Sequence, residues 1–197
     1  MKKLLLMTLV FLGQKIFFVR GKLRNALLRI INSIINYQVS DDPSNKRIQA
    51  SVNGVPFHFY FDGMSDTKQI FGNYNKKEIK FIKNQMKDGS IFIDIGSNIG
   101  FYSQNIASIF PKIKFEKIIS IEPNPILIKR HSENLSLLNQ KIKGMENKIY
   151  LENYAIGESN TNTFLDLNEG YGSARIIEKN GSKTIPIKMK TLLEILE

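Results

Sequence analysis

The 197-residue sequence contains no cysteine, and its two histidines, His58 and His131, lie far apart in the chain. Without cysteine a chain forms no disulfide bond and no thiolate metal site, and two distant histidines argue against a histidine-rich metal centre. Apolar runs of about 20 residues, which a membrane span requires, are also lacking. The hydrophobic fraction of 42% is nevertheless that of a chain with a packed core.

Acidic residues are missing from the first 36 positions, which carry seven Lys and Arg side chains. This arm supplies +7 of the formal net charge of +10, so the rest of the chain carries only +3. A domain that binds nucleic acid usually spreads its basic residues over the folded body. The distribution of charge therefore argues against a nucleic-acid partner.

Residues 1–39 are predicted to form a basic helical arm, with Leu23, Leu27, Ile30 and Ile34 in an apolar stripe at helical spacing. We expect this arm to lie on an anionic membrane surface, which would make the protein cytoplasmic and peripheral at the inner membrane. Two alternatives stay open. The helix packs on its own domain or on a partner, or the apolar start is a secretion signal without a small-residue cleavage site.

Residues 40–88 are predicted to form a lead-in to the main domain. The segment "IQASVNGVPFHFYF" predicts a β-hairpin around Asn53-Gly54, the favoured two-residue turn. An amphipathic helix is predicted over residues 76–86, with its inward side chains listed as Ile79, Phe81, Ile82 and Met86.

Residues 89–197 are predicted to form the main domain, in which strands and helices alternate. "SIFIDI" and "KIISIE" are short apolar runs typical of strands buried on both faces, and "NKIYLENYAI" predicts a third strand. A helix over 99–109 and a helix opened by Asn124-Pro125 connect them. This βαβαβ pattern predicts an α/β, Rossmann-like fold with a parallel sheet. A second hairpin around Asn180-Gly181 and a helix capped by Thr191 are expected after it.

The stretch "FIDIGSNIGFYS", residues 92–103, places Asp94 just before a glycine-containing turn. A dinucleotide fingerprint needs glycine at positions one, three and six, and counted from Gly96 the last two positions hold Asn98 and Phe101. Asp94 would also repel a pyrophosphate. S-adenosylmethionine has no phosphate and carries a cationic sulfonium and an amino group, which a carboxylate favours. The glycines leave room beside the backbone, and we expect N–H groups at the helix start to bind the methionine carboxylate.

Glu122 ends the second predicted strand, where an acid accepts hydrogen bonds from ribose hydroxyls in nucleotide-binding folds. Asp94 and Glu122 could instead be ordinary polar strand ends, with the glycines forming only a turn. The full order of acid, glycine turn, helix, strand and second acid favours S-adenosylmethionine as the cofactor.

Four segments of this chain resemble the FkbM-type methyltransferases, a branch of the class I S-adenosylmethionine-dependent family. They are "FIDIGSNIGFYS", "IISIEPNP", "NYAIG" at 153–157 and "GYGSA" at 170–174, within a resemblance over about residues 48–195. The resemblance implies a class I methyltransferase fold over 89–197, preceded by the hairpin and the basic helix. It further implies O-methylation of a hydroxyl group on a sugar, a glycolipid or a secondary metabolite.

The resemblance also implies the cofactor-binding residues. These are Asp94, Gly96, Ser97, Asn98, Gly100, Phe101, Glu122, Pro123, Asn124, Asn153 and Ala155. Tyr171 and Ser173 would fall near the mouth of the active site, and neither a general base nor a metal ligand is identified.

Family members continue beyond "IPIKMKTLLEILE" into a fourth strand, whereas this sequence ends there. We therefore expect a fold incomplete at its C-terminus, as in a truncated methyltransferase or one whose sheet a partner chain completes. Two alternatives remain: a non-catalytic cofactor-binding remnant or membrane-tethered interaction protein, and an RNA methyltransferase.

Overall fold

The computed structural model describes residues 8, 26, 30, 47–60, 69–70, 74–168, 171–179 and 181–196. The chain divides into two compact units, Met1–Glu78 and Ile79–Glu197. Apart from three single positions, the predicted basic arm lies outside the described residues, and the division into 1–39, 40–88 and 89–197 stays a prediction. Among the described helices, none combines the length and apolar character needed to cross a membrane.

The first unit contains the predicted hairpin. Strands β1 (Ile48–Val52) and β2 (Val55–Phe59) pair antiparallel, with Val52 opposite Val55. Asn53 and Gly54 have φ angles of 54° and 78°, as a type I′ turn requires at both central positions. Phe57 and Phe59 are fully buried, with their ring centroids 5.7 Å apart. The hairpin prediction is confirmed.

The remaining elements follow in order along the chain. They are α4 (Lys76–Gln85), β3 (Ile91–Ile95), α5 (Phe101–Ala107), β4 (Lys117–Ile121), α6 (Pro125–Lys141), η3 (Met145–Asn147), β5 (Ile149–Glu152), β6 (Ala155–Ile156), β7 (Thr161–Asp166), η4 (Tyr171–Ser173), β8 (Arg175–Ile177), β9 (Thr184–Lys190) and α7 (Leu192–Leu196).

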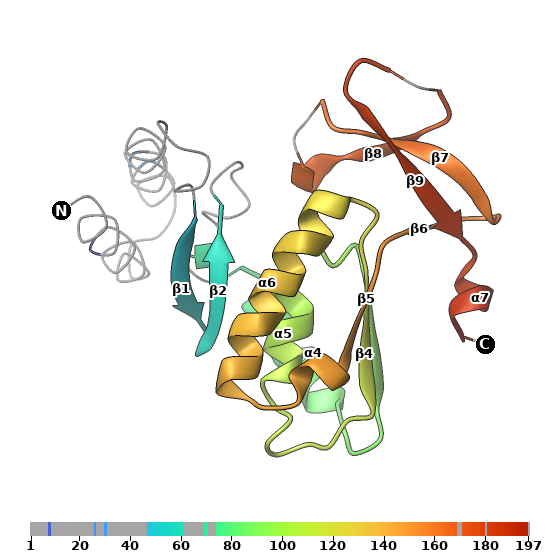
Figure 1. Ribbon diagram of the computed structural model, residues 1–197. Coiled ribbons are helices and arrows are strands. Elements are labelled where there is room, and N and C mark those ends of the chain that lie inside the picture. Colours follow the sequence, from blue (N-terminus) through green and yellow to red (C-terminus); the bar gives the residue numbers. More distant parts are fainter. Residues whose placement is uncertain are drawn as a thin grey trace. The chain divides into compact units, whose positions relative to one another are not determined.

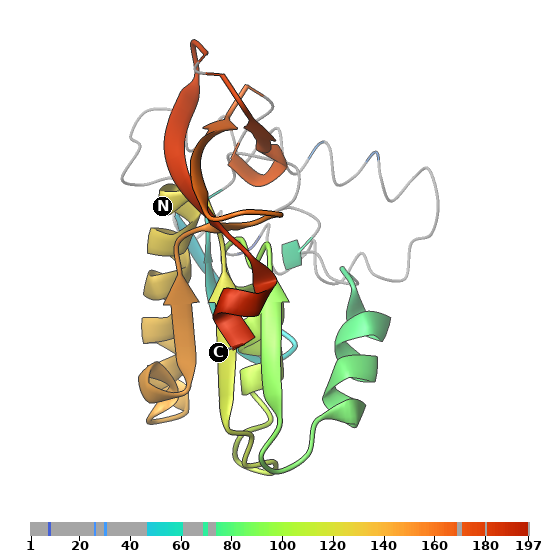
Figure 2. The same ribbon diagram turned by 90° about the vertical axis from the view of Figure 1, so that its right-hand side faces the viewer.

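A three-stranded parallel sheet of order β3-β4-β5 forms the centre of the second unit. Helices α5 and α6 cover one of its faces (Figures 1 and 2). Ile118 and Ser120 on β4 are fully buried because they point toward the helices, whereas Tyr150 on β5 is 50% exposed on the open face. The predicted α/β, Rossmann-like architecture is confirmed, with helix α6 starting at Asn124-Pro125 as expected.

A second sheet has the order β6-β9-β7-β8, and it corrects the prediction of a hairpin around Asn180-Gly181. Both β8 and β9 pair antiparallel with β7, on opposite edges of it, and so they do not pair with each other. Strand β7 lies between them, with Leu165 buried in the core of this sheet. An Asn-Gly pair in the sequence is therefore not sufficient to predict that the two flanking strands pair.

The third predicted strand, residues 147–156, is interrupted. Strand β5 ends at Glu152, and β6 begins at Ala155 in the other sheet. The Asn153 side chain donates to the carbonyl oxygens of Glu122 (2.9 Å) and Pro123 (3.0 Å), which holds the chain at the crossing.

The inward face of α4 is also narrower than predicted. Ile79 and Met86 are buried, but Phe81 is 65% exposed. Residues two positions apart on a helix point in nearly opposite directions, so Phe81 cannot share the face of Ile79.

Candidate functional site

The loop between β3 and α5 meets the end of β4 at the carboxyl edge of the parallel sheet. Gly96, Asn98 and Gly100 have φ angles of 76°, 51° and 84°, so the loop makes left-handed turns that glycine accommodates best. The N–H groups of Gly96 and Ser97 both donate to the carbonyl oxygen of Ile121, at 2.9 and 3.0 Å. The loop is thus fixed to the neighbouring strand.

The other loop amides are bonded as well. Ile99 N–H donates to the Asn98 side chain at 2.8 Å, and Gly100 N–H donates to the Ser97 carbonyl at 2.8 Å. The expectation that loop amides bind the methionine carboxylate therefore needs correction for residues 96–100, because these donors already have protein acceptors. Helix α5, with seven residues, begins with the buried Phe101 and has Gly100 as its N-cap.

Asp94, buried at the end of β3, holds the start of α5. Its Oδ2 accepts hydrogen bonds from the Ser103 N–H at 3.1 Å and the Ser103 hydroxyl at 2.5 Å. The Ser103 hydroxyl lies 2.7 Å from that of Ser120 on β4. Burial raises the pKa of Asp94, and the two bonds from Ser103 oppose that rise. Asp94 therefore both caps the helix and places a carboxyl group beneath the loop.

Glu122, one residue beyond β4, joins two loops. Its Oε2 accepts from the Asn98 N–H at 2.9 Å, and its Oε1 accepts from the Asn124 N–H at 3.0 Å. Burial raises the pKa of Glu122, the amides of Asn124 and Asn98 oppose the rise, and the nearby Asp94 carboxyl adds to it. Two acids that share a buried edge destabilise each other's charge, so a cationic ligand placed beside them would be favoured.

Space beside the loop is found at Gly96. A Cβ built on Gly96 would meet no atom within 4 Å, so this part of the backbone is open to a ligand. Asn153, exposed, lies at the same edge through its bonds to the Glu122 and Pro123 carbonyls. Asn124 is fully buried and caps α6 by accepting from the Ile126 N–H at 3.0 Å.

The structure brings together ten of the candidate residues and separates one. Ala155 is buried in the second sheet, packed with Leu165 and Ile187. Tyr171 and Ser173 form the short helix η4, which contacts α6.

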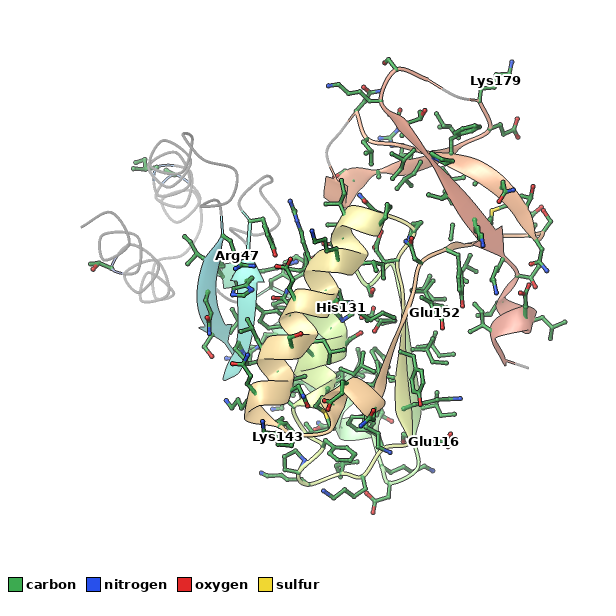
Figure 3. The ribbon with its side chains drawn as sticks, viewed as in Figure 1. Arg47, Glu116, His131, Lys143, Glu152 and Lys179 are labelled. Carbon is green, nitrogen blue, oxygen red and sulfur yellow. The ribbon has the colours of Figure 1, made fainter. Side chains whose placement is uncertain are left out.

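Two polar residues of α6 were missed as members of the site. His131, labelled in Figure 3, and Asn134 are both fully buried. Asn134 Nδ2 donates to the Ile99 carbonyl at 3.0 Å, and His131 Nδ1 lies 3.4 Å from the Ser97 hydroxyl. The sequence signal for them is that His131 and Asn134 fall on the same helix face as Leu127, Leu135 and Leu138, where apolar residues are expected.

Acid is expected to destabilise the protein through His131, because burial lowers the pKa of this side chain to about 3. The unfolded chain binds a proton below a pKa of about 6.5, whereas the folded chain does not until about 3. Stability present above pH 6.5 is therefore lost as the pH falls, by about 1.4 kcal/mol per unit. Urea unfolding at stepped pH, compared with His131→Asn, isolates this slope from the opposite contributions of Asp94 and Glu122. Equal slopes in both proteins would contradict the assignment.

A separate groove of about 540 Å³ lies on the open face of the parallel sheet. Its lining residues include Glu116, Lys148, Glu152 and Lys190, and none of them belongs to loop 96–100. The groove is therefore distinct from the candidate site.

Comparison with known proteins finds no matching family model and no matching curated protein. Among solved structures, 12 chains match. Trm5 of Methanocaldococcus jannaschii in complex with adenosine is 19% identical with a TM-score of 0.39, over 53% of this chain and 28% of that one. The tRNA m1G37 methyltransferase of M. jannaschii is 18% identical with a TM-score of 0.37, over 53% and 28%. Trm5b of Pyrococcus abyssi is 14% identical with a TM-score of 0.39, over 73% and 54%.

The chain thus spans between 28% and 54% of the length of these three proteins. The matches overturn the identification with FkbM-type methyltransferases, which is wrong, and with it the expected acceptors: sugar, glycolipid, other glycan or small molecule. The expectation of no nucleic-acid partner is wrong as well, and membrane association finds no support and is not retained.

The error about nucleic acid arose from averaging charge over the body of the chain. Residues 76–148 contain 13 Lys and Arg against 7 Asp and Glu, and two of those acids, Asp94 and Glu122, are buried. Within the body, residues 37–75 carry a net charge of −1 and residues 149–197 a net charge of −2, which lowers the sum to +3. The basic excess of the body therefore lies within residues 76–148.

Proposed function

We propose that this chain is an S-adenosylmethionine-dependent methyltransferase that acts on RNA. The observation that carries the cofactor assignment is the pairing of the buried Glu122 carboxylate with the open backbone at Gly96. Each carboxylate oxygen of Glu122 accepts one amide and keeps a further lone-pair position, which suits two ribose hydroxyls.

The residues present fit this cofactor in charge as well as in shape. Burial raises the pKa values of Asp94 and Glu122, because it destabilises their charged forms. A sulfonium and an amino group placed nearby would stabilise these charged forms. A phosphate-bearing nucleotide would meet the opposite effect, since two acids lie at this edge and the backbone N–H groups of residues 96–100 already have protein acceptors. When bound, the cofactor supplies a methyl group for in-line displacement by an acceptor atom.

The chain's own residues bind and orient. Glu122 and Asn153 fix the carboxyl edge of the sheet, the turn at Gly96 keeps space beside the backbone, and Asp94 holds α5 under the loop. No described side chain is assigned as a general base.

An RNA acceptor is supported by charge. The chain carries a net charge of +10, and residues 76–148 alone carry 13 Lys and Arg against 7 Asp and Glu. Clustered cations favour a phosphate backbone through counterion release. The names of the similar solved structures only indicate that tRNA is the first RNA to try.

The test is methyl transfer from tritiated S-adenosylmethionine to unmodified tRNA transcripts. Label in acid-precipitable RNA is expected with the wild-type chain and, at an S-adenosylmethionine concentration near the wild-type Kd, much less label with Glu122→Gln. Calorimetric binding of S-adenosylmethionine without labelling of any RNA would overturn the acceptor, and the absence of binding heat would overturn the cofactor assignment. RNA retention should weaken steeply with salt, because the interaction is electrostatic.

A further inference from the structure

Helix α6 carries a side chain, His131, that contacts the glycine loop at Ser97 and Gly100. A Cβ built on Gly100 would lie 2.2 Å from both Cδ2 and Nε2 of His131, so the imidazole ring occupies the place that a Gly100 side chain would need. The same ring has Nδ1 3.4 Å from the Ser97 hydroxyl. His131 thus meets the loop at two points, three residues apart.

The His131 Nε2 atom is buried and has no hydrogen-bond partner. Burial of such a polar atom costs stability that an apolar side chain would avoid. A leucine or phenylalanine would fill a helix-to-sheet interface without this cost. Histidine instead provides the contact with Ser97 and the close packing against Gly100.

We infer that His131 is a positioning residue for cofactor binding: its ring sets the path of loop 96–100 and so keeps the backbone at Gly96 open to S-adenosylmethionine. This inference rests on the proposed function. His131 itself is fully buried. It acts through Ser97 and Gly100.

The geometry also specifies the protonation of the ring. A neutral imidazole has one donor and one acceptor nitrogen. With hydrogen on Nδ1 the ring donates to the Ser97 oxygen and leaves the Nε2 lone pair facing Gly100, whereas hydrogen on Nε2 would leave a buried N–H without an acceptor. We therefore expect the Nδ1–H tautomer, which nitrogen-15 shifts of the ring distinguish.

The experiment compares three variants on the full chain. His131→Phe keeps the ring but cannot bond Ser97, His131→Asn keeps a nitrogen near the position of Nδ1, and Leu138→Val is a matched control two turns along the same buried face of α6. S-adenosylmethionine affinity is measured by calorimetry at a temperature where circular dichroism shows each variant folded.

His131→Phe is expected to weaken S-adenosylmethionine binding about tenfold, His131→Asn by less than about threefold, and Leu138→Val not at all. Rescue by asparagine is the result that a purely space-filling role would not give. Equal affinity for wild type and His131→Phe, or equal losses in both His131 variants, would overturn the inference.

A second readout does not need the cofactor. Amide hydrogen exchange at Ser97–Gly100 should be faster in His131→Phe than in Leu138→Val, because the loop has lost one of its two supports. A wild-type chain that fails to bind S-adenosylmethionine would overturn the proposed function. The exchange rates would still decide the positioning role: faster loop exchange supports it, and unchanged exchange overturns it.

Discussion

Replacing Gly100 by alanine is expected to lower the free energy of unfolding by about 3 kcal/mol or more, whereas the same change at Gly96 costs about 1 kcal/mol. Both glycines have positive φ, 84° and 76°, so the backbone strain of the two substitutions is similar. The difference comes from space. The new Cβ at Gly100 would overlap the His131 ring at 2.2 Å, and the one at Gly96 meets nothing within 4 Å.

For cofactor affinity, in contrast to stability, we expect a large effect of the substitution at Gly96. Gly96→Ala is expected to remain folded and to lose S-adenosylmethionine binding, since its methyl group fills the space left for the ligand. Urea titration followed by calorimetry of the folded variant separates these effects. If Gly96→Ala binds the cofactor as well as the wild type does, the open space at Gly96 is not the ligand site. If both variants lose equal stability, the contact of His131 with Gly100 is not tight.

Glu122→Gln is expected to weaken S-adenosylmethionine binding by about 10- to 100-fold, the effect of losing hydrogen bonds to a charged acceptor. An amide has a single oxygen and a donating nitrogen, so it cannot accept from the Asn98 and Asn124 amides together and also serve two hydroxyls. Part of the loss will appear as a looser loop, which lowers thermal stability as well.

Glu116→Gln is the matched control for that experiment. Glu116 is an exposed acid at the opposite edge of the same sheet, and its replacement removes the same charge far from the loop. It should leave cofactor affinity unchanged. Equal affinities for wild type and Glu122→Gln, measured by calorimetry at a temperature where both are folded, would remove Glu122 from the site.

The sequence was most informative where local chemistry decides structure. The apolar runs correctly predicted strands at Ile91–Ile95 and Lys117–Ile121, although Ile91 and Ile95 are exposed and β3 is not buried on both faces. Asn124-Pro125 supplies both a cap and a fixed first turn for α6. The Asn53-Gly54 turn needs positive φ at two positions, which this pair tolerates. Each of these features depends on neighbours in the sequence.

The features that could not be predicted depend on partners far along the chain. The choice of β8 and β9 to flank β7, instead of pairing with each other, is made by long-range packing. The loop amides at Gly96 and Ser97 are engaged by Ile121, 25 and 24 positions away, which no local pattern reveals. The bonds from Ser103 to Asp94, nine positions apart, are likewise set by the packing of α5 on β3.

Only Asn153 and Tyr154 connect β5 to β6, and the number of residues in this connection is constrained at both ends. Asn153 is tied to the carbonyls of Glu122 and Pro123, and two positions later Ala155 is already in the interior of the other sheet. Adding or deleting one residue there would turn Ala155 and its strand outward or pull Asn153 from its anchors. Related sequences should therefore vary in the identity of the residues between β5 and β6 and keep the same number of them. The connection of residues 142–148 does not join two sheets, so its length is not constrained in this way.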